Sequence, residues 1–585
     1  MSDVDREEDQ GGHVFRIVLA AVGLVQGFGF FVLAEVNWNQ YALWPMTAAT
    51  FCLLAPSTFQ LTFRLGPMRR ALAASLGFAV LMTLLALWFE WRIALHGEYA
   101  FDDYRDVFFC TLPIVAYIAW AFLQTWTDLG ERRFPYASLF RFAWSNILIA
   151  AIAAAFLGVF WLVLELWWSL FDLIGIRFFK DLFQASVFAW VFSGGVVGLG
   201  IAIARENGKL VPVLRRVVLM LFQVLAPVLA AAALLFLAVL PFTGLQVLWA
   251  TGSATLVLVC LLFALSLFVN AVVQDGDHPV PFGRWMNWLM MATLLAMPVF
   301  AAIAVYAVWL RIGQYGMTPE RFIGQLIVIV ATVHALAYAA AVVLKRGGWS
   351  SVVTRVNPWI AAGVLALALL MLTPVADPYG WSARAQVARL LDGKVAAEKF
   401  DFGYLKFQLG KPGSAAFEKL RTVKGQPQQA VIDKKLAAAD KAASYWDTVD
   451  NSNMVKPDEM ALIRDKLVVR PAGTAVPDEV LKAVNDQRGW AFKDCLGDKD
   501  QCGMLETDIN EDGQPEYLFL SKGYALSGAL LYKDGTAWQL RDAGVTAHPG
   551  EDTREAVWAA FLSGDTELVQ PEYYDIRIGK NRLHY

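Results

Sequence analysis

The sequence AWSNILIAAIAAAFLGVFWLVLELWWSLFD, at residues 143–172, contains two acidic side chains, Glu165 and Asp172, and neither lysine nor arginine. The hydrocarbon core of a bilayer is about 30 Å thick and an α-helix rises about 1.5 Å per residue, so about 20 apolar residues cross it. This stretch is long enough to cross with a tilt or to extend beyond the bilayer. It predicts a transmembrane helix.

Similar apolar runs recur along the chain up to residue 375. They do not alternate between apolar and polar residues, as the strands of a membrane β-barrel do. Two of them are separated only by Pro241-Phe242, which favours a tight hairpin. The sequence therefore predicts an all-α transmembrane bundle of about eleven spans. Besides 143–172, the runs are 14–34, 42–63, 71–90, 107–126, 184–204, 216–240, 243–270, 285–310, 322–344 and 357–374.

Charged residues are concentrated in the last third of the chain. Only 17% of the 585 residues are charged and 57% are hydrophobic, but 59 of the 101 charged residues lie in 376–585. The low charge elsewhere and the net charge of −3 exclude a large cytosolic enzyme, a disordered or fibrous chain and a nucleic-acid binder. We predict an acidic cytoplasmic tail at 1–13, a transmembrane domain at 14–375 and a soluble α+β domain at 376–585.

The loops that follow the runs 42–63, 107–126, 184–204 and 322–344 carry most of the basic residues of the transmembrane part. Basic residues are retained on the cytoplasmic side. Two loops depart from this pattern. One loop on the opposite side contains Arg177 and Lys180, and the loop 271–283, on the basic side, contains no lysine or arginine. We expect a cytoplasmic N-terminus without a cleavable signal peptide, and residues 376–585 outside the cytoplasm. The basic residues are Arg64, Arg69, Arg70, Arg132, Arg133, Arg141, Arg205, Lys209, Arg215, Arg216, Lys345, Arg346 and Arg355.

The region after residue 376 mixes helical and strand patterns. Apolar residues repeat at helical spacing from Ala383 to Leu391, and residues 428–446 also predict a helix. The sequence DFGYLKFQLG, at 401–410, alternates and predicts a strand. We expect Ser414 to cap a further helix.

Beyond Trp490 the pattern favours strands. EYLFLS at 516–521 and ALLYKDGTAWQL at 529–540 are typical of strands, and Asp534-Gly535 inside the second predicts a hairpin turn. The region is therefore predicted to be α+β.

Cys495 and Cys502 are the two cysteines of the soluble part. A short disulfide loop between them suits an oxidising compartment, and two free thiols are the alternative. A zinc site is less well supported, because two cysteines without a nearby histidine provide too few ligands.

The sequence Asp508-Ile-Asn510-Glu-Asp512-Gly-Gln-Pro-Glu516 is followed by a predicted strand. Oxygen-bearing side chains at alternate positions, with a glycine at the sixth, match the start of a calcium loop. The twelfth position is Phe519 instead of a bidentate glutamate, so the match to an EF-hand is incomplete. Calcium, bound for a structural purpose, is the one cofactor that the sequence suggests, and an acidic turn without an ion is the alternative.

Polar residues inside the predicted spans are costly and often functional. His334 lies in the middle of the tenth run, and Glu165 lies among tryptophans in the fifth. A proton relay needs a row of several ionisable groups, so we favour a histidine hydrogen-bonded across a helix interface and a glutamate in the interfacial aromatic belt. Nucleotide-binding loops and the motifs of classical hydrolases are not found in the sequence.

The segment Tyr315-Gly316-Met-Thr318-Pro319-Glu-Arg321 precedes the tenth run. Thr318 is a favourable N-cap and Pro319 suits the first helical position. Capping does not explain Arg321, which could pair with a lipid headgroup or with another helix.

Three segments give the chain a resemblance to a known family. RIGQYGMTPERFIG at 311–324, TPVADPYGWSARAQVARLLDGKV at 373–395 and DFGYLKFQLGKPGSAAFEKL at 401–420 resemble the uncharacterised bacterial inner-membrane family known as domain of unknown function 4153. The resemblance extends from about residue 140 to 420. It implies a multi-pass protein of the bacterial inner membrane and no particular reaction, so it supplies no catalytic residues.

The sequence is compatible with three kinds of function. The first is an envelope scaffold, sensor or partner-binding protein, which would contact membrane lipids and bind an envelope protein through 376–585. The second is a secondary transporter or channel-like protein, which predicts interrupted helices. The third is a membrane enzyme acting on lipid-linked substrates, for which Asp102, Asp103 and Asp106 are the nearest carboxylates at one face. We favour the first, which is not an enzyme.

Overall fold

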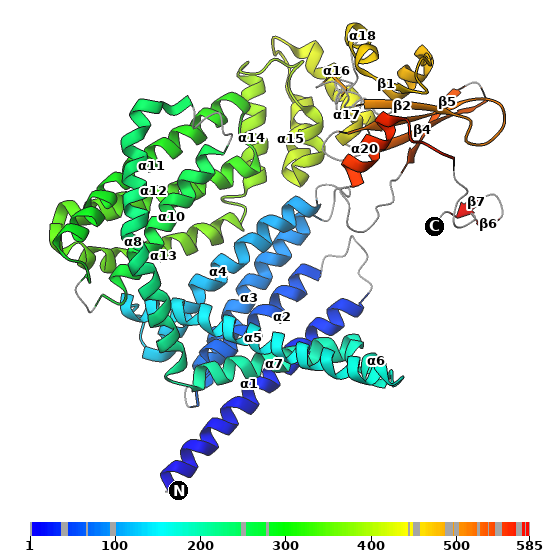
Figure 1. The fold of residues 1–585 in the computed structure, drawn as a ribbon. Coiled ribbons are helices and arrows are strands. Elements are labelled where there is room, and N and C mark those ends of the chain that lie inside the picture. The colour runs from blue at the N-terminus through cyan, green and yellow to red at the C-terminus, as the bar shows by residue number, and fades with distance from the viewer. Residues whose placement is uncertain are drawn as a thin grey trace. The chain divides into compact units, whose positions relative to one another are not determined.

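The structure is a computed structural model that forms two compact units, Met1–Tyr445 and Trp446–Tyr585, each described by itself below (Figure 1). It describes residues 3–36, 45–65, 68–93, 101–246, 253–276, 280–442, 445–448, 457–485, 495–496, 502–522, 527–535, 537–543, 553–568, 576–578 and 581–583.

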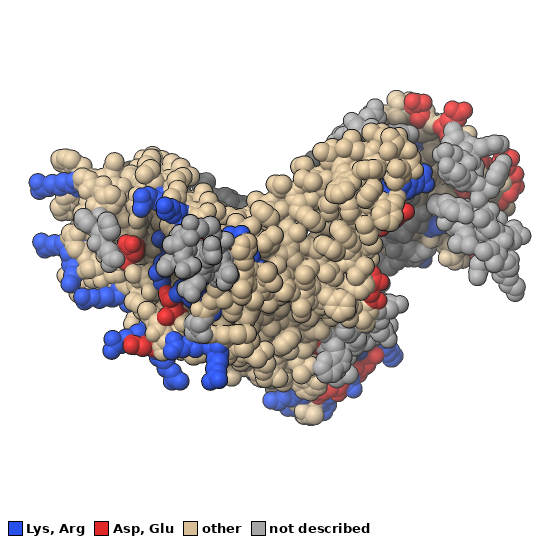
Figure 2. Space-filling view, turned by 90° about the horizontal axis from the view of Figure 1, so that it is seen from below, with Lys and Arg blue, Asp and Glu red and all other residues tan. Residues whose placement is uncertain are grey.

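The first unit is helical, and each of the eleven predicted runs coincides with a helix. Ten of these helices are long and apolar enough to cross a membrane, and α2 is the exception among the described residues. Figure 2 shows a broad surface without charged side chains, with Lys and Arg gathered along its margins. The helices are α1 (Asp3–Glu35), α2 (Pro45–Thr62), α3 (Met68–Ile93), α4 (Phe101–Leu129), α5 (Tyr136–Leu173), α7 (Ser186–Glu206), α8 (Leu210–Thr243), α10 (Ala254–Val273), α11 (Arg284–Tyr315), α12 (Pro319–Lys345) and α13 (Ser350–Met371).

Helix α2 is stabilised by a carboxylate from a neighbouring helix. Nine of its 18 residues are buried. The N–H of Met46 donates to Glu90 Oε1 at 2.6 Å, and the N–H and hydroxyl of Thr47 both donate to Glu90 Oε2. The first N–H groups of a helix have no partner within it, and leaving them unpaired in a buried position is costly. Glu90, from α3, therefore caps α2.

The break between the seventh and eighth runs lies later than the sequence suggested. Helix α8 continues through Pro241 and Phe242, and Gly244 follows its end with a φ of 73°. Membrane helices tolerate proline because neighbouring groups satisfy the freed carbonyl, whereas a positive φ favours glycine. The predicted length of the fifth run is confirmed, since α5 has 38 residues and leads through the short α6 (Phe178–Gln184) to α7.

Helices α1 and α7 cross with their backbones in contact. A Cβ built on Gly194 would overlap the carbonyl oxygen of Gly23, and one built on Gly198 would overlap that of Leu19. These glycines allow the close packing that small residues provide in membranes. At one end of the crossing, the Arg16 guanidinium pairs with Glu206 at 2.5 Å.

The helices between α13 and residue 445 belong to the first unit and pack against its spans. They are α14 (Pro378–Leu391), the π-helical turn η2 (Tyr404–Gln408), α15 (Gly410–Thr422) and α16 (Gln429–Lys441). Leu405, Phe417 and Leu436 are buried in one hydrophobic cluster with Phe78 and Phe108 of the spans. The change in composition at residue 375 and the boundary between the compact units near residue 445 are therefore different boundaries.

The strand expected at 401–410 is wrong, because these residues are helical. Phe402, Leu405 and Leu409 are buried at spacings of three and four residues, so helical geometry places all three in the core. The Tyr404 N–H donates to Asp401 Oδ1 at 2.7 Å and begins the turn. Ser414 lies inside α15 instead of capping it, and its hydroxyl donates to the Lys406 carbonyl at 3.1 Å. The helix expected at 383–391 is present in α14, and that expected at 428–446 is present but ends at Lys441, because Ala442 has an extended backbone.

The second unit contains a five-stranded sheet in the order β1-β2-β3-β4-β5, with β1 parallel to β2 and the other pairs antiparallel. Its elements are α17 (Tyr445–Thr448), which begins in the first unit, α18 (Pro457–Lys466), β1 (Val468–Arg470), β2 (Cys502–Thr507), β3 (Glu516–Ser521), β4 (Ser527–Asp534), β5 (Ala537–Ala543), α20 (Thr553–Ser563), and the separate hairpin β6 (Ile576–Ile578) and β7 (Asn581–Leu583). The predicted strands and the turn at Asp534-Gly535 are confirmed.

Both faces of strand β3 are buried. Tyr517 and Phe519 belong to one hydrophobic cluster, while Leu520 packs with Trp558 and Phe561 of α20 in another. This explains why EYLFLS does not alternate cleanly between apolar and polar residues.

We expect Gly194→Val to destabilise the protein, because the added methyl groups would separate the backbones of α1 and α7. Overpacking of this kind costs about 1–3 kcal/mol. The check is the thermal unfolding of the purified protein in detergent. Gly158→Val is the matched control, since a Cβ at this α5 glycine meets nothing within 4 Å. Equal unfolding temperatures for the two variants would contradict the close crossing.

Candidate functional site

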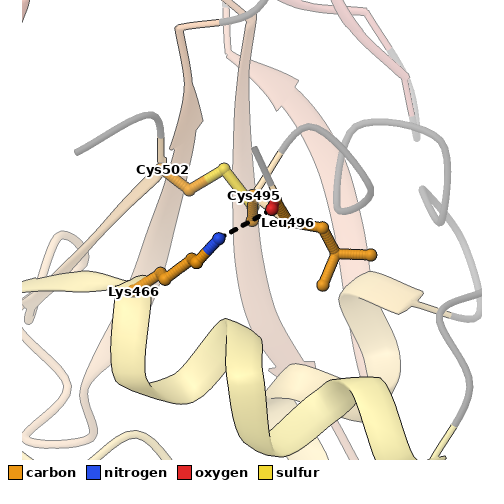
Figure 3. Close-up of a disulfide and its surroundings, with 4 residues drawn as sticks. All are labelled: Lys466, Cys495, Leu496 and Cys502. Carbon is orange, nitrogen blue, oxygen red and sulfur yellow. Dashed lines mark hydrogen bonds between the residues drawn. A yellow bond between two sulfur atoms is a disulfide. The ribbon is translucent and has the colours of Figure 1, made fainter. Parts of the chain in front are cut away.

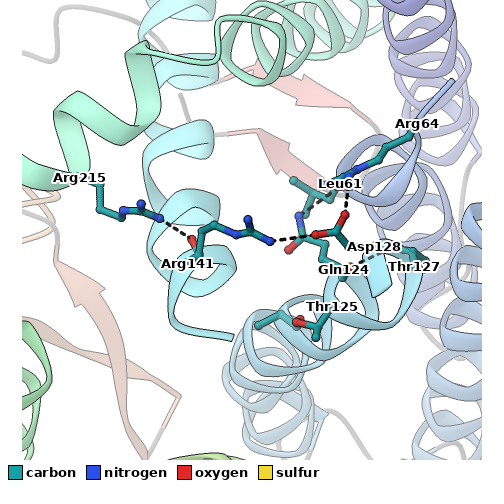
Figure 4. Close-up of polar contacts among 9 residues, drawn as sticks. Leu61, Arg64, Gln124, Thr125, Thr127, Asp128, Arg141 and Arg215 are labelled. Atoms are coloured by element: carbon teal, nitrogen blue, oxygen red, sulfur yellow. Dashed lines mark hydrogen bonds and ion pairs between the residues drawn. The ribbon is translucent and has the colours of Figure 1, made fainter. Parts of the chain in front are cut away.

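One end of the helical bundle gathers arginines from several helices (Figure 4). Arg64 follows α2, Arg141 lies near the start of α5, and Arg215 lies in the second turn of α8. Asp128, at the end of α4, pairs with both Arg64 and Arg141, the latter at 2.9 Å. The sequence marked these arginines only as signals of orientation, and the structure brings them together.

The same end is held by hydrogen bonds to backbone carbonyls. The Gln124 amide donates to the Leu61 carbonyl at 3.1 Å, and the Asn146 amide donates to Gln124 Oε1 at 2.7 Å. Arg205 donates to the carbonyls of Gln60 and Phe63, the second at 2.8 Å. The contacts to Gln60 and Leu61 satisfy carbonyls in the last turn of α2, which have no partner within the helix, and Phe63 is the residue just after it.

Two cavities open beside these arginines. One has a volume of about 670 Å³ and the other about 590 Å³. Arg141, Pro212 and Arg215 line both cavities, so the two adjoin. Volumes of this size suit small-molecule ligands.

A second polar cluster lies between α5, α10, α12 and α13. The Tyr136 hydroxyl donates to Asn270 Oδ1 at 3.1 Å, and the Asn270 amide donates to the Tyr338 hydroxyl at 2.8 Å. Tyr338 donates to Asn357 Oδ1 at 3.0 Å, and the Asn357 amide returns to Asn270 Oδ1 at 2.5 Å. Asn270, Tyr338 and Asn357 form a closed cycle of hydrogen bonds, into which Tyr136 donates, and the network joins the four helices.

His334 and Glu165 do not form a relay. The His334 Nδ1 lies 2.9 Å from the Val330 carbonyl of its own helix, and its ring meets Tyr338 and Phe263 edge-on. The hydrogen bond therefore stays within α12 instead of crossing an interface. Glu165 is exposed on α5, and no hydrogen bond or ion pair joins it to His334 within the described ranges.

The Tyr315–Arg321 segment is the turn between α11 and α12. Gly316 has a φ of 83°, Thr318 caps α12 by accepting from the Arg321 N–H at 3.4 Å, and Pro319 is the first helical residue. The Arg321 guanidinium donates to the Gly316 carbonyl at 2.8 Å and lies over the Tyr315 ring. Arg321 thus closes its own turn.

Helix α14 docks on this turn. Ser382 and Gln386 both donate to the Met317 carbonyl, at 2.9 and 2.8 Å. Arg389 donates to three carbonyls at the end of α11, those of Ile312, Gly313 and Gln314.

Tyr404 lies near the same place. Burial, together with the charge of Glu320, raises the pKa of Tyr404 well above its usual range, so its phenol remains neutral.

Cys495 and Cys502 form a disulfide with Cα atoms 5.3 Å apart (Figure 3). The Lys466 ammonium, at the end of α18, donates to the Leu496 carbonyl at 2.7 Å and ties the disulfide loop to this helix. The two cysteines are only seven residues apart in the sequence, so the disulfide closes a short loop.

The acidic loop is organised by its own side chains. Asp508 accepts from the N–H groups of Asp512 and Gly513, and Asn510 donates to Glu516 Oε1 at 2.9 Å. Groups of three or more His, Cys, Asp or Glu side chains that could hold a metal are not found among the described residues. Calcium binding by this loop stays a prediction.

Some predicted residues lie outside the description. The side chains of Asp102 and Asp103 are not described, and Asp106 is exposed. Conversely, the sequence did not single out Glu90, Asp128 or the pairing of Asn270 with Asn357. An isolated carboxylate or amide at a helix end is the signal that could have found them.

The fold and the ten apolar helices define a multi-pass helical membrane protein. The sequence model of the family described as domain of unknown function DUF4153 matches residues 17–420, and the chain belongs to this family. The match begins well before the region of the resemblance at 140–420 and ends inside α15. No curated protein and no solved structure is significantly similar to the chain.

We expect Arg389→Gln to loosen α14 from the α11–α12 turn, because hydrogen bonds from a charged donor contribute about 1.5–3 kcal/mol. Limited proteolysis between residues 372 and 445 should accelerate. Arg384→Gln removes the same charge from the same helix, but Arg384 lies over the Trp381 ring and is exposed. Equal proteolysis of the two variants would show that the three carbonyl contacts do not hold α14.

Proposed function

We propose that the chain is a protein of the bacterial inner membrane whose N-terminus lies in the cytoplasm. Its helical bundle holds residues 446–585 on the periplasmic side, where this unit binds an envelope protein as a scaffold or sensor. The main support for this orientation is that the arginine-rich end and the start of α14 lie at opposite ends of α13.

Contacts within the first unit support this separation. Asp275, after α10, lines the second cavity together with Arg141 and Arg215. The adjacent Gly276 lies against the side chain of Thr354, near the start of α13. Helix α13 therefore begins at the arginine-rich end, and its 22 residues span about 33 Å before the chain reaches α14.

Two general rules then give the orientation. Basic residues are retained in the cytoplasm, which assigns the arginine-rich end to that side and the residues after Met371 to the other. A disulfide is stable in the oxidising periplasm, which agrees with Cys495–Cys502 on the same side.

The role in partner binding is supported by the second unit's own architecture. It has separate hydrophobic clusters, so it has a core of its own. Within the described part of the chain, β5 pairs with β4 alone and is an edge of the sheet. An edge strand can pair with an extended segment of another protein.

Transport is the second candidate, because cavities of about 670 and 590 Å³ open between helices at one end of the bundle. Solute flux into liposomes containing the purified protein would favour it over the scaffold.

Reporter fusions test the orientation. We expect alkaline phosphatase, which is active only outside the cytoplasm, to be active when fused after Tyr585 and inactive when inserted at Gly347, in the turn between α12 and α13. Activity at Gly347 and none at Tyr585 would overturn the proposed orientation.

The disulfide gives an independent measurement in cells. Cys495 and Cys502 should resist an alkylating reagent until a reductant is added, and a Cys495→Ser/Cys502→Ser variant should be destabilised by about 2–3 kcal/mol, as expected for a short loop. Immediate alkylation in intact cells would contradict a periplasmic location.

A photo-crosslinking residue tests partner binding. Placed at the exposed Gln539 of β5, it should give a discrete protein adduct in cells. The same residue at exposed Lys434 of α16 serves as the control. Adducts no stronger at 539 than at 434 would contradict binding through the sheet edge.

A further inference from the structure

The arginine-rich end carries more positive charge than its own carboxylates neutralise. Its acidic side chains, Asp128 and Glu206, pair with Arg64, Arg141 and Arg16. Arg205 and Arg215 line the larger cavity in addition. Asp275, in the second cavity, is near enough to Arg215 for their charges to attract. With Arg216 of that cavity included, six arginines face three carboxylates, so three positive charges are left over.

Arg215 has most of its hydrogen-bonding capacity left over. A guanidinium has five N–H donors in a planar fork. Among the described residues, Arg215 makes one hydrogen bond, from Nη1 to the Arg141 carbonyl at 3.4 Å. It is half-buried and lines both cavities, so its remaining donors are available to a ligand there.

Arg141 lies next to Arg215 and can also contact a ligand in the cavities. One of its nitrogens donates to Asp128, and its guanidinium lies over the Phe142 ring at 4.7 Å. A carboxylate shared with Arg64 leaves Arg141 only partly neutralised. Two neighbouring guanidinium groups repel each other, and an anion between them would remove that repulsion.

The rest of the larger cavity is mostly apolar. Phe15, Leu61, Ile149 and Val211 line it from four different helices. A wall of this kind beside guanidinium groups suits an amphiphilic anion. Basic pockets between transmembrane helices on the cytoplasmic side commonly bind lipid phosphates.

We propose that Arg141 and Arg215 bind a phosphate group in these cavities, carried either by an anionic phospholipid or by a soluble phosphate. The planar fork of arginine matches two phosphate oxygens, which favours phosphate over a monovalent halide. The site is independent of the role proposed for residues 446–585, because all of its residues belong to the first unit.

Titration of the full-length protein in a neutral detergent tests the site. Tryptophan fluorescence during heating follows unfolding, and the probes are phosphatidylglycerol, phosphatidylcholine and inorganic phosphate, the last compared with chloride at equal ionic strength. We expect phosphatidylglycerol or inorganic phosphate to raise the unfolding temperature. Arg215→Gln should weaken this binding about tenfold, the effect of losing about one charge-assisted hydrogen bond.

Arg132→Gln is the matched control, since it removes the same charge from an exposed position in the loop between α4 and α5. Arg141→Gln is the second test, but it also breaks the pair with Asp128, whereas Arg215→Gln leaves that pair intact.

The outcomes separate the sources. Stabilisation by phosphatidylglycerol alone supports a lipid, and stabilisation by inorganic phosphate supports a soluble ligand. Equal responses to phosphatidylglycerol and phosphatidylcholine without a response to phosphate, or equal binding by Arg215→Gln and Arg132→Gln, would overturn the site.

Discussion

The absence of water from the bilayer core is the constraint on which the bundle depends. Every polar group placed there must find a partner within the protein, because an unpaired one costs several kcal/mol. Glu90 meets this requirement for the first N–H groups of α2, and Gln124 and Arg205 meet it for the carbonyls of Leu61 and Gln60 in its last turn. A helix of 18 residues with many polar side chains is thus retained among ten more apolar ones.

Polar side chains that join helices also explain how the bundle is organised. The network of Asn270, Tyr338 and Asn357 connects α10, α12 and α13. Asp128 connects the ends of α2, α4 and α5 through two arginines. Carboxylates and amides here hold helices together.

The helices after the last span are packed into the same helical unit. Arg389 and Gln386 attach α14 to the α11–α12 turn, and α15 and α16 complete the hydrophobic cluster of the spans. The family match ends at residue 420, inside α15, so the family's region includes α14 and most of α15 but not α16.

The sequence by itself determined the membrane class, the eleven helices and the strands of 516–521 and 529–540, because apolar periodicity and bilayer thickness are local properties. It misplaced the end of α8 and the conformation of 401–410. There, the alternating pattern put Phe402 on one face of a strand and Leu405 and Leu409 on the other, whereas a helix buries all three in one core. Only the tertiary structure decided that Arg141 and Arg215 share cavities, because they are 74 residues apart and meet only when α5 and α8 pack.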